Sequence, residues 1–175
     1  ADIAAYYADR LAVHGATPMG VDWACRPTQE LRFVQLLRGL GLHYGESLND
    51  LGCGYGALLD HLDARHPGHE IDYLGIDASA PMVATARERF RNRPQIAFAQ
   101  GTQSLRIAGY GVSSGIFNVK LDRPVILWED HIRITLQTMA RHVRRGMAFN
   151  MLHRHHRHSS HPQELYFADP DIWRR

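Results

Sequence analysis

Cysteine and lysine are scarce in this sequence, and each shortage excludes a class of protein. The 175 residues include 2 cysteines, too few for the disulfide framework of a small secreted domain. The basic residues are almost all arginine, since Lys120 is the one lysine, and the formal net charge is only +2. A charge this close to neutral argues against a nucleic-acid binder, which normally has a clustered basic face.

Long apolar runs are missing as well. The sequence has no stretch of about 18 apolar residues of the kind that crosses a membrane. Its first residues lack the basic and apolar regions of a secretory signal peptide. We therefore expect a cytoplasmic protein that has neither a membrane nor a nucleic acid as its partner.

What is present suits one folded domain, because 45% of the residues are hydrophobic. From residue 46 onward, short apolar runs alternate with helical patterns. Strands are expected at 46–51, 71–76, 95–99, 108–113 and 147–152. Helices are expected at 2–14, 29–40 and 57–65, after the capping residue Ser79, and from Trp128 to a stop at Gly146. Residues 17–20 are expected to form a loop.

The alternation of strands and helices predicts an α/β fold. We expect a doubly wound, mostly parallel sheet with helices on both faces. Residues 1–45 are expected to form a helical cap or lid that packs on the core, and residues 46–175 to form the core itself.

A glycine-rich turn, DLGCGYG at 50–56, follows the first expected strand and opens a helix. Glycines there permit positive φ and let a ligand approach the backbone. Asp77 ends the next strand, where an acidic residue can accept hydrogen bonds from ribose hydroxyls. The pattern predicts a nucleoside site, and the alternative is a tight turn without a ligand. Its last two glycines are closer together than in the dinucleotide pattern.

Three segments resemble the class I S-adenosylmethionine-dependent methyltransferases: LNDLGCGYG at 48–56, YLGIDAS at 73–79 and IAFAQG at 96–101. The resemblance covers roughly residues 27–155 and implies a Rossmann-like core with S-adenosyl-L-methionine as its cofactor. The turn would contact the amino-acid end of the cofactor through Gly52, Cys53 and Gly54. Asp77 would hold the ribose, and Ala78 with Met82 would border the adenine.

Other positions of the implied cofactor site depart from the family pattern or have a second interpretation. Thr102 stands where the family often has an Asp that reaches the adenine amino group. Trp23 and Arg32 would reach the methionine end, or would simply pack ahead of the sheet. The full implied set is Asp50, Gly52, Cys53, Gly54, Gly56, Asp77, Ala78, Met82, Gly101, Thr102, Trp23 and Arg32.

The sequence contains no recognisable catalytic constellation, and methyl transfer does not require one. The cofactor supplies the leaving group, so the protein mainly aligns the reactants and excludes water. Ser114 and Asn118 follow the fourth expected strand, where they would line an acceptor pocket or cap a turn. Tyr7 belongs to the aromatic N-terminal piece, which we expect to close over a small-molecule acceptor or else to pack as an ordinary helix.

The histidine-rich run at 153–161 is interpreted as a surface loop, and no metal site is expected. Its spacing fixes no tetrahedral set of ligands. Cys53 is interpreted as a small residue suited to a crowded turn, because no base is evidently paired with it.

The end of the chain departs from the family pattern, which usually adds a helix and an antiparallel strand pair after strand five. Asp169 and Pro170 look like the start of that helix, and the strand pair is missing. We therefore expect a C-terminally incomplete domain, short by roughly 30 residues. The fifth strand would be an exposed edge, through which we predict a homodimer.

The sequence thus predicts an S-adenosylmethionine-dependent methyltransferase that acts on a small molecule. One alternative is a non-catalytic cofactor-binding or scaffold domain. An NAD(P)-dependent oxidoreductase is disfavoured by the glycine spacing and by the absence of a Tyr-x-x-x-Lys pair.

Overall fold

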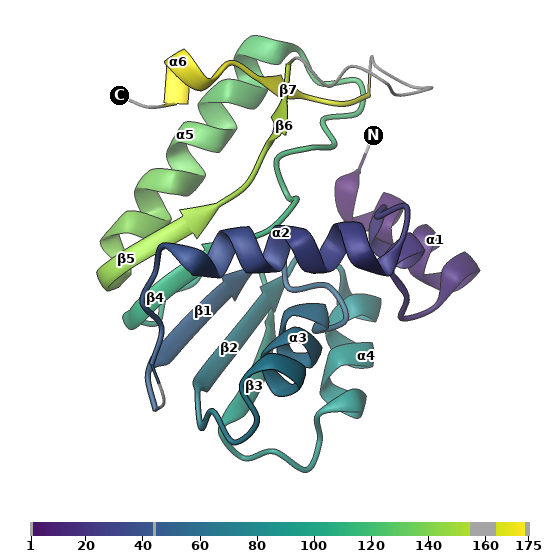
Figure 1. Cartoon of the computed structure of the whole chain (residues 1–175). Coiled ribbons are helices and arrows are strands. Elements are labelled where there is room, and N and C mark those ends of the chain that lie inside the picture. Colours follow the sequence, from purple (N-terminus) through teal and green to yellow (C-terminus); the bar gives the residue numbers. More distant parts are fainter. Residues whose placement is uncertain (1, 44, 155–163, 174–175) are drawn as a thin grey trace.

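The computed structural model describes residues 2–43, 45–154 and 164–173. Its centre is a parallel sheet of five strands in the order β3-β2-β1-β4-β5 (Figure 1). The strands are β1 (Ser47–Leu51), β2 (Asp72–Asp77), β3 (Ile96–Gln100), β4 (Ala108–Ser113) and β5 (Val143–Phe149). β2 and β4 flank β1 on opposite sides, so the strand order reverses there. Ligands bind at such a reversal in open α/β sheets.

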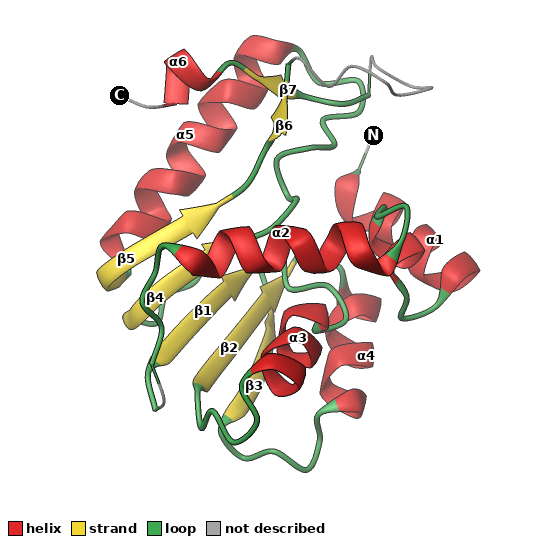
Figure 2. Ribbon diagram, in the orientation of Figure 1, coloured by secondary structure: helices red, strands yellow, loops and turns green. Residues whose placement is uncertain are grey.

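Helices cover both faces of the sheet (Figure 2). One face carries α2 (Arg26–Arg38), α3 (Ala57–Arg65) and α4 (Ala80–Arg89), and the other carries α5 (Val125–Arg141). The two faces of β1 follow this division, because Leu48 joins the cluster under α2 and α3 whereas Leu51 packs with Met139 of α5. The doubly wound α/β fold is therefore confirmed.

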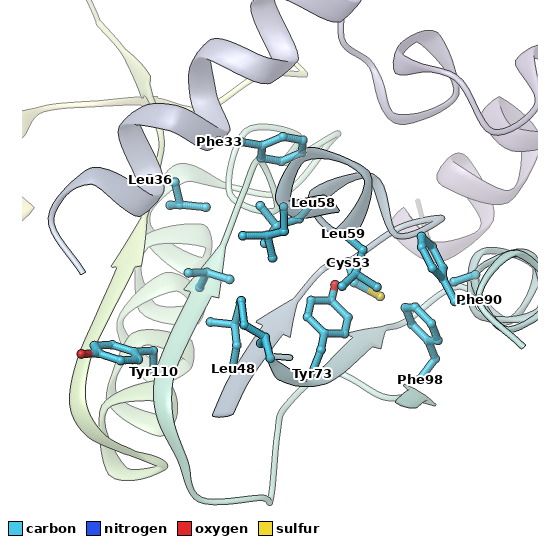
Figure 3. Packing of buried hydrophobic residues seen from close by; sticks show 14 of the residues in the cluster. Phe33, Leu36, Leu48, Cys53, Leu58, Leu59, Tyr73, Phe90, Phe98 and Tyr110 are labelled. Carbon is cyan, nitrogen blue, oxygen red and sulfur yellow. The ribbon is translucent and has the colours of Figure 1, made fainter. Parts of the chain in front are cut away.

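The larger apolar cluster lies between the sheet and the helices α2, α3 and α4 (Figure 3). Tyr73 of β2 and Phe98 of β3 meet there with their ring centroids 5.8 Å apart. Gly75 leaves room for this contact, since a Cβ at that position would lie 2.6 Å from Phe98 and 2.8 Å from Sγ of Cys53. The packing therefore holds the glycine-rich turn closely against β2.

The N-terminal segment contains one element that the sequence did not predict. Helix α1 (Ile3–His14) begins as expected, with Asp2 Oδ1 accepting a hydrogen bond from the Ala4 N–H at 3.0 Å. The loop expected at 17–20 is wrong, because Pro18–Val21 form a 3-10 helix, η1. The fixed φ of Pro18 favours the tight turn, and Gly20 lies so close to Gly15 that no Cβ would fit. Helix α2 begins at Arg26, whereas the expected helix begins at residue 29.

The boundary between α5 and β5 was predicted wrongly. Helix α5 ends at Arg141, and β5 runs from Val143 to Phe149 with Gly146 inside it. The helical spacing of apolar residues continues to Val143, but Val143 pairs with Ala108 of β4 and Gly146 pairs with Tyr110. Pairing with a neighbouring strand has therefore overridden the local period.

Two short strands and a short helix follow β5. β6 (Leu152–His153) pairs in parallel with β7 (Phe167–Ala168), and α6 (Pro170–Trp173) comes next. Asp169 caps α6 as expected, since its Oδ1 accepts a hydrogen bond from the Asp171 N–H at 3.1 Å.

Two features are absent from the part of the chain that the structure describes. None of its helices is long and apolar enough to cross a membrane. It contains no group of three or more side chains arranged to hold a metal ion. Most of the histidine-rich run lies outside the described residues.

Candidate functional site

A cavity of about 880 Å³ opens at the carboxyl ends of β1, β2 and β4. Its volume falls within the range of small-ligand sites, which is about 300–1,000 Å³. Along the edge of the sheet, Asp77 stands at the end of β2, the glycine-rich turn follows β1, and the segment after β4 comes next. Parts of α1, η1, α5 and β7 complete the wall.

The glycine-rich turn is tight because two of its glycines have positive φ where a side chain would not fit. Gly52 has φ 79°, and a Cβ there would lie 1.9 Å from Cγ2 of Ile116. Gly56 has φ 87° and begins α3, and a Cβ there would lie 2.7 Å from the Phe90 ring. The N–H groups of Gly52 and Cys53 both donate to the carbonyl of Ile76, at 2.7 and 3.1 Å. The turn is therefore locked onto β2.

The Asp77 carboxylate joins this turn to the start of α4. Its Oδ2 accepts a hydrogen bond from the Gly54 N–H, and its Oδ1 accepts one from the Ser79 N–H, both at 2.9 Å. Ser79 stands at the N-cap position as expected, but its side chain makes no capping hydrogen bond. Burial raises the pKa of Asp77, and the two N–H donors oppose that shift.

Asp50 lies deeper in the same end of the cavity and is 3% exposed. Its Oδ2 accepts a hydrogen bond from the Tyr73 hydroxyl at 2.6 Å. Burial raises the pKa of Asp50 to about 7, the Tyr73 hydrogen bond opposes this shift, and the negative charge of Asp77 adds to it. The site therefore contains two close carboxylates, one of which titrates near neutral pH.

The structure brings most of the residues implied for the cofactor to this cavity. Ala78, Met82, Gly101, Thr102 and Trp23 line its wall together with the turn and Asp77. Arg32 and Gly56 are outside the wall. The Arg32 guanidinium lies over the Trp23 ring, 5.5 Å from its centroid, so it packs on a residue of the wall. The cofactor-binding roles of all these residues stay predictions.

The residues predicted for the acceptor pocket also line the cavity, and two of them hold other segments in place. Ser114 Oγ accepts a hydrogen bond from Nδ2 of Asn150 at 2.9 Å. Asn118 Oδ1 accepts one from the Leu152 N–H at 3.1 Å, so it links the segment after β4 to β6. Tyr7 belongs to the α1 part of the wall.

The comparisons with known proteins agree with this geometry. Residues 49–146 match a family model described as a methyltransferase domain. A putative methyltransferase of Mycobacterium tuberculosis is 48% identical over 124 residues, which cover 71% of this chain and 74% of that protein. The chain belongs to the class I S-adenosylmethionine-dependent methyltransferase family.

Two further matches cover less of the matched protein's own length. A trans-aconitate 2-methyltransferase of M. tuberculosis is 44% identical over 57 residues, which cover 33% of this chain and 21% of that protein. A solved mycolic acid cyclopropane synthase, complexed with S-adenosylhomocysteine and CTAB, has a TM-score of 0.58 at 19% identity. That match covers 81% of this chain and 50% of the synthase, and it shows a shared fold.

Sequence reasoning missed the part of the methyltransferase cavity that α5 and the segment before it supply. Arg123, Trp128 and His131 all line the cavity. In the sequence alone, Trp128 marks only the start of an expected helix. A Trp followed three positions later by a His was the available signal, since such residues share one face of a helix.

Proposed function

We propose that this methyltransferase binds S-adenosylmethionine at the Asp77 end of the cavity and methylates a small molecule at the α5 end. One observation carries the proposal. A single cavity joins the glycine-rich turn and Asp77 to the wall made by α5 and β7. A cofactor and an acceptor could therefore lie side by side in it, as a direct displacement requires.

The cofactor end has the groups that the nucleoside and amino-acid parts of S-adenosylmethionine need. Each oxygen of Asp77 accepts one backbone N–H, which leaves each a lone pair for a ribose hydroxyl. The carbonyl of Gly52 accepts no hydrogen bond within the described residues, so it is available to an ammonium group. Ala78 and Met82 offer an apolar border for the adenine.

The cofactor, when bound, supplies a methyl group on a positively charged sulfur. The protein then has to align the acceptor and exclude water. α1 and η1 suit the second task, because they lie over the cavity and are tied together. The Tyr6 hydroxyl donates to Asp22 Oδ2 at 2.6 Å, and Arg10 Nε pairs with Asp22 Oδ1 at 2.6 Å. We propose that residues 1–45 act as a cap on the core, and that these two contacts hold α1 and η1 together within it.

A small-molecule acceptor suits the size and the enclosure of the cavity. About 880 Å³ must hold both the cofactor and the acceptor, which leaves no room for a large substrate to enter entirely. The name of the trans-aconitate 2-methyltransferase relative states a small-molecule acceptor for that protein.

The test is an assay of S-adenosylhomocysteine release with a panel of small-molecule acceptors. Asp77→Asn keeps the size of the side chain but replaces one acceptor oxygen with an NH₂ that faces an N–H of Gly54 or Ser79. We expect it to lose turnover, whereas Asp130→Asn on the exposed face of α5 keeps it. Binding of S-adenosylhomocysteine without transfer to any acceptor would instead favour the non-catalytic alternative.

A further inference from the structure

An arginine, a tryptophan and a histidine form one stack at the acceptor end of the cavity. The Trp128 ring is 1% exposed, and its Nε1–H donates to the carbonyl of Phe117 at 3.0 Å, which fixes its position. The Arg123 guanidinium lies 5.5 Å from the centroid of this ring. The His131 ring stacks on it at 5.0 Å with an interplanar angle of 28°. Arg123, Trp128 and His131 all line the cavity.

The Arg123 guanidinium forms no ion pair and no hydrogen bond within residues 2–43, 45–154 and 164–173. It lies over Trp128, and its charge also acts on the carboxylate of the adjacent, exposed Asp122. Other arginines on the surface do form ion pairs, including Arg133 of α5, whose Nη1 lies 2.7 Å from Asp130 Oδ1. Arg123 lines the cavity with five N–H donors that have no hydrogen-bond acceptor in the described part of the chain, although the Asp122 carboxylate lies near enough to interact with its charge.

The groups around Arg123 favour an anion with an apolar body. Val119, Leu165 and Phe167 line the same end of the cavity and offer apolar surface. His131 adds no competing positive charge at neutral pH, because burial and the nearby Arg123 lower the pKa of its imidazole. Glu164, which also lines the cavity, makes no ion pair with Arg123 in the described part of the chain.

We propose that the methyl acceptor is a small carboxylic acid whose carboxylate is bound by Arg123, with its apolar body against Val119, Leu165 and Phe167. Guanidinium and carboxylate match in planar, two-point hydrogen-bonding geometry, which makes arginine the usual anchor for this group. The inference rests on the proposed function, because it concerns the acceptor end of the same cavity. Arg123 is an anchor here, and no proton transfer is assigned to it.

The structural alternative is that Arg123 only packs on Trp128. A matched pair of probes separates the two, because benzoate and benzamide share a shape but differ in charge. Calorimetric titrations of both probes are run on the whole chain, with and without saturating S-adenosylhomocysteine. Arg123→Gln removes the charge, Arg123→Lys keeps the charge but not the fork, and Arg133→Gln is the matched control.

We expect wild type to bind benzoate about fivefold more tightly than benzamide. The expected ratio of affinities is modest because solvent partly screens the charge of Arg123. Arg123→Gln should abolish this preference, Arg123→Lys should retain part of it, and Arg133→Gln should leave it unchanged. Added salt should weaken the binding of benzoate and not that of benzamide. Equal affinity for the two probes in wild type, or an unchanged preference in Arg123→Gln, overturns the proposal.

A failure of the proposed carboxylate site can be distinguished from a failure of the proposed function. S-adenosylhomocysteine affinity should be the same in all four proteins, since Arg123 precedes α5 and is not part of the turn, β2 or α4, which supply the proposed cofactor site. Failure of S-adenosylhomocysteine to bind would count against the cofactor site, whereas the preference for benzoate is still measured on the ligand-free protein.

Discussion

The pH dependence of stability gives a direct test of the buried carboxylate Asp50. Burial raises its pKa from 3.8 to about 7. Below about pH 4 Asp50 is protonated in both the folded and the unfolded state. Its contribution to the free energy of unfolding is then fully present. As the pH rises toward 7, the Asp50 carboxyl group ionises first in the unfolded state. The free energy of unfolding therefore falls, and the contribution of Asp50 is lost. Three pKa units correspond to about 4 kcal/mol at neutral pH.

Asp50→Asn removes this titration and keeps the acceptor for the Tyr73 hydroxyl. We expect the variant to gain stability relative to wild type between about pH 4 and pH 7, by about 4 kcal/mol, and then to keep that difference. Urea unfolding at a series of pH values measures it. The free energy of unfolding of wild type is subtracted from that of the variant at each pH. This is necessary because the raised pKa of Asp77 also makes stability depend on pH in both proteins.

Asp130→Asn is the control for this series, since Asp130 is exposed and pairs with Arg133 on the helix surface. Its difference from wild type should stay within a few tenths of a kcal/mol at every pH. Stability curves of Asp50→Asn and wild type that run parallel from pH 4 to pH 8 would show that Asp50 is not held protonated by the fold.

Three further predictions concern the turn, the cap and the sheet edge. Gly52→Ala should destabilise the fold more than Gly68→Ala does, by about 1–3 kcal/mol in urea unfolding. Both glycines have positive φ, but only Gly52 lacks space for a Cβ. Equal losses of stability would argue against the clash with Ile116. Removal of residues 1–23 should abolish turnover in the release assay, and full activity without them would refute the proposed cap. β5 is the last strand at its edge of the sheet, so light scattering should show a homodimer formed through that edge, whereas a strictly monomeric species would contradict this.

Local signals were sufficient to predict the fold and some of the residues that line the cavity. The alternation of apolar runs predicts the five strands in approximate position, and the glycine spacing singles out the turn and Asp77, which do line the cavity. These features depend on residues close together in sequence. The N-cap at Asp169 was predictable for the same reason.

Features that depend on distant contacts could not be predicted in this way. The start of β5 is set by pairing with β4, and no property of Val143 alone distinguishes a helix end from a strand start. The stack of Arg123, Trp128 and His131 lines the cavity only because α5 packs beside β7, which is distant in the sequence. The raised pKa of Asp50 likewise arises from burial by elements far away in the chain.

The cavity at Asp77 is proposed as an S-adenosylmethionine site, and every other role proposed for the cavity depends on this. Calorimetric titration with S-adenosylhomocysteine tests it, with NAD as the competing nucleoside ligand and Asp77→Asn and Asp130→Asn as the matched variants. We predict saturable binding to wild type and Asp130→Asn, strongly weakened binding to Asp77→Asn, and no binding of NAD. S-adenosylhomocysteine binding that is unchanged in Asp77→Asn, or binding of NAD in its place, would contradict the account.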